Sequence, residues 1–287
     1  MRRKLPLLLV LTGLMLFGFA ACGQAATLAP PTDAPVVMTA TLPPTEAPTE
    51  SPPVLTGDAA RGGRLYDKWT EELGLDVPEG NHPLWATQST NTRTGSDTWR
   101  CKECHGWDYK GVEGAYGSGS HKTGFVGVMG VSGDDPNAIL GTLKGSSNPD
   151  HDFSEFMDDQ ALIDLALFLS GALIDYSPWI GTGDDAAGRL FFDDTCTECH
   201  GPQGLSLNFG DSSEPEYHGT IATDNPWEFL HKIRFGQPAT PDMPALFDAG
   251  VEDSVYADVL AYAATFPLFS PVSEGGVMYD NWMAACN

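Results

Sequence analysis

Apolar residues recur at helical spacing in two stretches of the chain, one late in each half. Residues 159–173 place apolar side chains three and four positions apart, which is typical of an amphipathic helix with one buried face. The apolar positions that follow this spacing are Leu162, Ile163, Ala166, Leu167 and Phe168. A second helix is predicted over residues 254–266. Each half of the chain is therefore expected to end in a helix.

A repeated segment near the start of each half predicts an opening helix. Residues 57–66 read Gly-Asp-Ala-Ala-Arg-Gly-Gly-Arg-Leu-Tyr, and residues 183–192 read Gly-Asp-Asp-Ala-Ala-Gly-Arg-Leu-Phe-Phe. Asp58 and Asp184 are each placed to cap the helix, because an Asp side chain there accepts a hydrogen bond from the first turn. Opening and closing helices in both halves predict a duplicated module, with a boundary near residues 177–182.

The first residues predict export from the cytoplasm. Arg2, Arg3 and Lys4 precede a short apolar run that ends near Phe19, and small residues follow it. A basic start, a short apolar stretch and small residues before a cleavage site are typical of an export signal, predicted here over residues 1–21. The run is too short and too interrupted for a membrane span, and an uncleaved N-terminal anchor is the alternative interpretation.

Small residues directly before Cys22 resemble the bacterial lipoprotein box. This resemblance implies that Cys22 is lipidated and becomes the new N terminus. Residues 22–55 are rich in Pro and Thr and contain no aromatic residue, so they cannot bury a core. They predict a disordered tether which, at ~3 Å per residue, would reach on the order of 100 Å. Lipid and tether together would hold the folded part at the extracytoplasmic face of a bacterial membrane, in the periplasm or at the cell surface.

Length and charge limit the classes of partner. The remaining chain of about 230 residues is long enough for two domains of ordinary size. The whole sequence has 15 Lys and Arg against 39 Asp and Glu, a formal net charge of −24 at pH 7. This balance disfavours nucleic acid and anionic lipid headgroups as partners. An acidic surface suits a redox protein with a basic docking surface, and it equally suits plain solubility.

Two pentapeptides carry the candidate chemistry: Cys-Lys-Glu-Cys-His at residues 101–105 and Cys-Thr-Glu-Cys-His at residues 196–200, each followed by Gly. The pattern Cys-x-x-Cys-His is the attachment signal of c-type haem. Two thiols three positions apart can each form a thioether with a haem vinyl group, and the adjacent His becomes an axial ligand of the iron. The predicted attachment residues are Cys101, Cys104 and His105 for one haem and Cys196, Cys199 and His200 for the other.

Other uses of Cys-x-x-Cys explain less of the pattern. A thioredoxin-like redox site would need a βαβ context, whereas helix signals and Gly-rich loops surround both motifs. A zinc site of four thiolates, or a disulfide within each pair, would leave both histidines without a purpose. Two covalently attached haem c groups are therefore predicted as the cofactors.

The order of opening helix, haem motif, loops and closing helix resembles the class I cytochrome c fold, over nearly all of residues 57–269. The resemblance implies an all-α fold of two tandem domains. In each domain the first and last helices would cross, with the haem between them and the loops. The domains are expected at residues 56–177 and 183–269, and residues 68–100 form an insertion relative to a minimal domain. Residues 270–287 are left as a C-terminal tail.

The resemblance also implies a distal ligand on each iron. In class I cytochromes this ligand is a Met, often before Pro, and Met243 precedes Pro244 ahead of the second closing helix. Aligning the two halves on Asp164 and Asp258 places His151 within two positions of Met243, because the two residues lie 13 and 15 positions before these aspartates. The expected iron ligands are His105 and His151 for the first haem and His200 and Met243 for the second.

Three rivals of His151 stay open. Met129 and His121 lie near the first motif in sequence, and Met157 lies close to the closing helix. The alternative without a functional role is that His151 is an exposed histidine in a loop. Because a Met thioether stabilises reduced iron, the second haem is expected to be the more oxidising of the two.

Several other residues give weaker indications. Three further histidines show no ligand-like placement, and surface or capping roles are expected for them: His82, His218 and His231. Three arginines could pair with haem propionates or form ordinary surface salt bridges: Arg100, Arg189 and Arg234. Residues 275–282 are similar to residues 62–69 and look like the start of a third unit, with truncation, a relict or a tail that packs back all open. Cys286 is left over as a free thiol or an intermolecular link.

These expectations combine into one function. The chain is expected to be an exported, lipid-anchored dihaem cytochrome c that carries electrons between extracytoplasmic or membrane-associated redox partners. The competing class is a dihaem oxidoreductase, similar to thiosulfate dehydrogenases or peroxidases. A third possibility is an electron-transfer subunit of a larger dehydrogenase or oxidase. An electron carrier is favoured over an enzyme, because both irons have candidate distal ligands and no acid–base constellation stands out.

Overall fold

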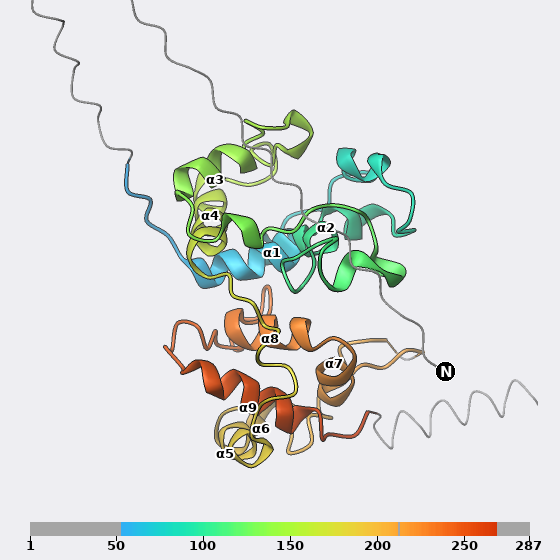
Figure 1. Ribbon diagram of the computed structural model, residues 1–287, viewed down its shortest axis with the longest axis vertical. Helices are drawn as coiled ribbons and strands as arrows, with labels where there is room; N and C mark the ends of the chain where they lie inside the picture. The colour runs from blue at the N-terminus through green and yellow to red at the C-terminus, as the bar shows by residue number, and fades with distance from the viewer. Residues whose placement is uncertain (1–52, 212, 269–287) are drawn as a thin grey trace, which may run out of the picture. The chain divides into compact units, whose positions relative to one another are not determined.

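The computed structural model describes residues 53–211 and 213–268 (Figure 1). The export signal, nearly all of the tether with Cys22, and the tail with Cys286 lie outside the described residues. Within them the chain forms helices joined by turns and loops, and β-type pairing is limited to isolated bridges. The all-α expectation is confirmed for this part of the chain. No helix among these residues has the length and apolar character needed to cross a bilayer.

The helices follow one another as two similar sets (Figure 1). The first half contains α1 (Ala59–Leu73), η1 (Pro83–Thr87), η2 (Gly95–Trp99), α2 (Cys101–His105), η3 (Ala115–Gly117), η4 (Gly119–His121), η5 (Met129–Val131), α3 (Pro136–Leu143), η6 (Pro149–His151) and α4 (Asp159–Gly171). The second half contains α5 (Asp185–Thr195), α6 (Thr197–His200), α7 (His218–Asp224), α8 (Pro226–Phe235) and α9 (Asp253–Ala263). Both predicted closing helices are confirmed as α4 and α9, and each ends two or three residues earlier than expected.

The two opening helices begin as their sequences predict. The carboxylate of Asp58 accepts a hydrogen bond from the Arg61 N–H at 2.9 Å, and that of Asp184 accepts one from the Ala186 N–H at 2.9 Å. Each bond satisfies a first-turn donor that has no partner within the helix. Gly74 ends α1 in a left-handed conformation, with φ of 62°, that a residue with a side chain rarely adopts.

Each opening helix packs against the closing helix of its own half. Asp164 of α4 accepts a hydrogen bond from the backbone N–H of Asp58 at 2.9 Å. Asp258 of α9 accepts the equivalent bond from the N–H of Asp184 at 2.7 Å. The alignment of the halves on Asp164 and Asp258, made from sequence, therefore corresponds to a contact that both halves repeat.

Glycine allows the close approach of these helices. A Cβ atom at Gly62 would lie 2.1 Å from the backbone oxygen of Asp164, and one at Gly188 would lie 1.9 Å from that of Asp258. Neither backbone oxygen can move away without disturbing its own helix. The glycines of the repeated segment thus mark the points where α1 crosses α4 and α5 crosses α9.

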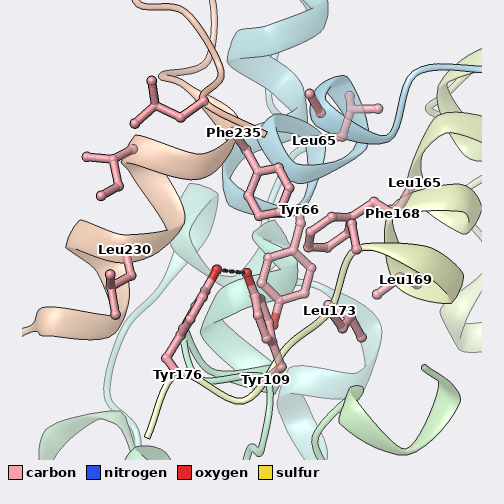
Figure 2. Packing of buried hydrophobic residues seen from close by; sticks show 14 of the residues in the cluster. Leu65, Tyr66, Tyr109, Leu165, Phe168, Leu169, Leu173, Tyr176, Leu230 and Phe235 are labelled. Carbon is pink, nitrogen blue, oxygen red and sulfur yellow. Dashed lines mark hydrogen bonds between the residues drawn. The ribbon is translucent and has the colours of Figure 1, made fainter. Parts of the chain in front are cut away.

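The two halves share a hydrophobic cluster (Figure 2). Tyr66 and Phe168 of the first half pack near Phe235 of α8, with 5.1 Å between the ring centres of Phe168 and Phe235. A Cβ atom at Gly63 would lie 2.4 Å from Phe235, so only glycine fits beneath this ring. Arg234 donates hydrogen bonds of 3.0 Å to the Tyr176 hydroxyl and to the backbone oxygen of Ala172. Arg234 is therefore a buried interface residue, and of its two expected roles the surface salt bridge is wrong.

Candidate functional site

The first Cys-x-x-Cys-His motif forms the short helix α2. Cys101 and Cys104 are three positions apart and so lie on one face of this helix. Both line a cavity of about 420 Å³, a volume within the range of about 300–1,000 Å³ that is typical of ligand and cofactor pockets. Burial raises the pKa of each thiol to about 12, so both are protonated at neutral pH.

His105 is oriented by a backbone contact behind it. Its Nδ1 lies 2.7 Å from the backbone oxygen of Val126, and as the carbonyl can only accept, Nδ1 carries the proton. Burial lowers the pKa of His105 to about 4, so the ring is neutral at pH 7. The lone pair of the ring is therefore on Nε2. A metal-binding imidazole with its other nitrogen bonded to a carbonyl has this arrangement.

His151 reaches the same cavity from η6, about fifty positions along the chain. Asn148 caps this turn by accepting a hydrogen bond from the Asp150 N–H at 3.1 Å, and the His151 ring packs against Phe153 with ring centres 5.2 Å apart. Its Nδ1 is buried and has no hydrogen-bond partner. Burial lowers the pKa of His151, which favours the neutral ring. An unpartnered buried nitrogen at a cavity is an observation that calls for a ligand.

The two imidazoles are spaced as a shared metal ion would require. The ring centres of His105 and His151 lie 6.2 Å apart, and the ring planes are inclined at 77°. Two imidazoles on opposite sides of one metal ion, each about 2 Å from the metal through nitrogen, would have ring centres about 6 Å apart. With both cysteines on the same cavity wall, the residues present fit a covalently attached haem.

The insertion of residues 68–100 supplies part of the cavity wall. His82, Leu84 and Trp99 line the cavity together with the motif residues. The backbone N–H of His82 donates to the Thr98 hydroxyl at 2.9 Å, and the indole N–H of Trp99 donates to Gly80 at 3.1 Å. These hydrogen bonds connect residues within the insertion, next to the first motif. The sequence pattern did not predict the local structure of this insertion.

None of the three rivals of His151 lines this cavity. His121 stacks on Tyr116, with ring centres 4.6 Å apart, and its Nδ1 faces the Glu103 carboxylate at 3.4 Å. Met157 is buried in the hydrophobic cluster, and Met129 packs against that cluster from η5. His151 is thus the predicted distal residue that the structure brings to the first motif.

The second motif has a different environment. Cys196 precedes α6, and Cys199 is exposed. The Nδ1 of His200 is buried without a hydrogen-bond partner. The nearest aromatic ring is that of His218, with ring centres only 4.3 Å apart. This spacing is shorter than two imidazoles on one metal ion would have, so the present position of His218 is that of a neighbour of His200 and not of an opposed ligand.

The sequence interpretation missed His218. Its side chain is 7 % exposed, and its Nδ1 lies 3.2 Å from the backbone oxygen of Gly204, so the expected surface role is wrong. The repeat contained a signal: Tyr217-His218-Gly219 in the second half matches Phe125-Val126-Gly127 in the first. Val126 provides the carbonyl behind His105, whereas His218 lies beside His200 through its ring, and the Nδ1 of His200 has no hydrogen-bond partner.

Met243 is half-buried in the turn that follows α8. Its backbone N–H donates to Thr240 at 3.1 Å, and its backbone oxygen lies 2.8 Å from where a Cβ at Gly236 would be. These contacts fix the turn before Pro244 but do not involve His200. Distal ligation by Met243 stays a prediction.

The contacts of the remaining histidines and of Arg189 show which of their expected roles are correct. His82 accepts a hydrogen bond from the Leu84 N–H at 3.2 Å, so its capping role is confirmed, although its ring is buried. His231 is fully buried between the Tyr109 hydroxyl and the Gly63 carbonyl, and a surface role for it is wrong. Arg189 forms the exposed ion pair that was one of its two expected roles, with Asp193.

Arg100 lines the first cavity and is engaged by a buried carboxylate. Its guanidinium lies 2.5 Å from Asp67, which also contacts the Lys232 ammonium of α8. Burial alone would raise the pKa of Asp67, but the two cations outweigh burial and hold the pKa well below its ordinary range. This ion triad connects the wall of the first cavity to the second half.

Among residues 53–211 and 213–268, no three His, Cys, Asp or Glu side chains gather as ligands of a metal ion. A haem iron takes at most two ligands from the protein, so this finding does not bear on the haem prediction. Comparison of the chain with protein-family models, with curated proteins and with solved structures found no match.

Proposed function

We propose that this chain is a dihaem c-type cytochrome that carries electrons between redox partners outside the cytoplasm. The observation that carries the proposal is the first cavity. Two thiols and two neutral imidazoles from distant parts of the chain meet there, and the imidazoles are 6.2 Å apart. When bound, a haem c supplies one-electron redox chemistry at its iron.

Different residues of the chain would attach the haem and bind its iron. Cys101 and Cys104 would attach it, His105 would bind the iron through Nε2, and His151 would bind from the other side. The Val126 carbonyl keeps the Nε2 lone pair of His105 available by holding the Nδ1 proton. The second set of residues proposed is Cys196, Cys199, His200 and Met243.

A carrier is favoured over a catalyst by the first cavity. An enzyme of the peroxidase-like or thiosulfate dehydrogenase-like kind needs an iron that substrate can reach, whereas an iron held between the His105 and His151 rings, 6.2 Å apart, would be bound by both imidazoles. The formal net charge of −24 suits redox proteins with basic docking surfaces as donor and acceptor. Export, lipidation at Cys22 and tethering to the outer face of a bacterial membrane remain part of the proposal.

The test is production of the full chain in a bacterium that matures c-type cytochromes. Two haems per chain are expected from the pyridine haemochrome spectrum and from the mass of the polypeptide. Replacing the cysteines of one motif by Ser should remove one haem only: Cys101→Ser with Cys104→Ser for the first, and Cys196→Ser with Cys199→Ser for the second. A colourless wild-type chain, made beside a control cytochrome that is loaded normally, would overturn the proposal.

Carbon monoxide separates a carrier from a catalyst. With both irons closed by two protein ligands each, the reduced protein should bind little carbon monoxide. Stoichiometric binding to a fully loaded protein would favour the catalytic class instead.

A further inference from the structure

A third imidazole lies at the first cavity and has no part in the proposed ligation. His82 belongs to the insertion, and its ring is 7 % exposed. It packs against Trp99, with ring centres 4.8 Å apart, and against Phe153, with ring centres 5.4 Å apart. It lines the same cavity as the two motif cysteines, His105 and His151.

His82 is also the neighbour of the proposed distal ligand. The ring centres of His82 and His151 lie 6.3 Å apart, and both rings contact Phe153. The turn η1, which His82 caps, packs against η6, which contains His151. Loss of the His151 imidazole would open a space directly beside His82, in the direction of the cavity it already lines.

The hydrogen bonding of His82 explains why His151, and not His82, is the proposed second axial ligand of the first haem in the wild-type chain. The Nδ1 of His82 accepts the Leu84 N–H, so the neutral ring carries its proton on Nε2. To bind iron through Nε2, the ring would have to move its proton to Nδ1 and give up the bond from Leu84. His105 needs no such change, because its Nδ1 already donates to Val126.

We propose that His82 is a reserve axial ligand of the first haem, which binds the iron when His151 is absent or displaced. The proposal rests on the proposed function, because it requires a haem in this cavity. Its consequence is an iron that stays closed to small external ligands even when the distal loop moves. The insertion then protects the carrier from side reactions at the first haem.

The test compares four forms of the haem-loaded full chain: wild type, His151→Ala, His82→Ala and the double variant. His82→Ala should keep the spectrum of wild type. His151→Ala should stay low-spin with two nitrogen ligands by near-infrared magnetic circular dichroism, and should bind little carbon monoxide when reduced. The double variant should become high-spin at one haem and bind close to one carbon monoxide per chain.

Two results would overturn the proposal. One is a His151→Ala variant that is already high-spin and binds as much carbon monoxide as the double variant. The other is a His82→Ala variant that opens the iron by itself, since His82 would then be the second axial ligand in the wild-type chain. His151→Ser, which also leaves the space beside His82 open, gives the same comparison if the Ala variant does not fold. Haem content, measured in every form, separates failure of this inference from failure of the proposed function.

Discussion

Asp67 is 1 % exposed, and its carboxylate lies between the guanidinium of Arg100 and the ammonium of Lys232. The two cations come from opposite sides of the boundary between the halves. Both cationic side chains are mostly buried, and both form an ion pair with the Asp67 carboxylate. A buried ion group of this kind costs desolvation to form, but removal of one member leaves the others without compensation.

Asp67→Asn is therefore expected to lower the free energy of unfolding by about 3–5 kcal/mol, with the shape of the side chain retained. Denaturant titration of the full chain measures this change. The matched control is Asp193→Asn. Asp193 is the equivalent residue in the repeated segment, but it is exposed and pairs only with Arg189, so the loss should stay below about 1 kcal/mol. Equal losses in the two variants would contradict the role given to the triad.

The same carboxylate predicts a dependence on pH. Lys232 and Arg100 hold the folded pKa of Asp67 well below its ordinary value. Such a group stabilises the folded chain fully above its unfolded pKa of about 4, and the stabilisation is lost as pH falls below that value. The difference in unfolding free energy between wild type and Asp67→Asn should be complete at neutral pH and smaller at about pH 3. A difference that is unchanged or larger in acid would exclude this account.

At the scale of the elements, the crossings of opening and closing helices depend on glycine. Gly62→Ala would place a Cβ 2.1 Å from the backbone oxygen of Asp164, and a backbone atom in a packed helix cannot yield as a flexible side chain can. A loss of about 1–3 kcal/mol or more in unfolding free energy is expected from such overpacking. Gly171→Ala is the control, because Gly171 ends α4 with no atom near the new methyl group. Ala there should be neutral or stabilising.

The elements that could be predicted from sequence are those with local causes. The starts of α1 and α5 follow from the capping bonds of Asp58 and Asp184, and α4 follows from apolar periodicity within one segment. The insertion has no such periodicity. Its turns η1 and η2 are held by hydrogen bonds between residues well separated within the insertion, such as the His82 N–H to Thr98 and the Trp99 indole N–H to Gly80. For this reason the cavity wall, and His82 within it, could not be derived from the pattern.

The candidate site was predictable to the extent that it depends on spacing. The motif residues follow from the spacing within the two pentapeptides, and His151 was predicted because Asp164 and Asp258 put the halves in register. The burial of His218 and His231 was missed because each depends on a partner in another part of the fold. His231 needs Tyr109 and Gly63 of the other half to satisfy its ring nitrogens. Sequence spacing alone contains no information about such a contact.

At the scale of the molecule, the halves are joined by polar and apolar contacts together. The hydroxyls of Tyr109 and Tyr176 contact each other (Figure 2). The Tyr109 hydroxyl also contacts the His231 ring, and Arg234 donates to the Tyr176 hydroxyl across the same interface. Buried networks of this kind are strong only when every member has a partner. The interface therefore favours one fixed arrangement of the halves, with the two proposed haem sites held at a constant separation.

Phe235→Ala tests whether the halves unfold as one unit. Phe235 is fully buried, and its ring covers Gly63 of α1 and packs on Phe168 of α4. Its truncation should lower the unfolding free energy by about 3–5 kcal/mol. Because the cluster is shared, backbone amides of α4 and α9 should lose hydrogen-exchange protection by similar amounts. Phe209→Ala, at an exposed aromatic residue of the second half, should leave both helices protected. Loss of protection in α9 alone would show that the first half is stable without the second, and the fixed arrangement of the two sites would then have to be abandoned.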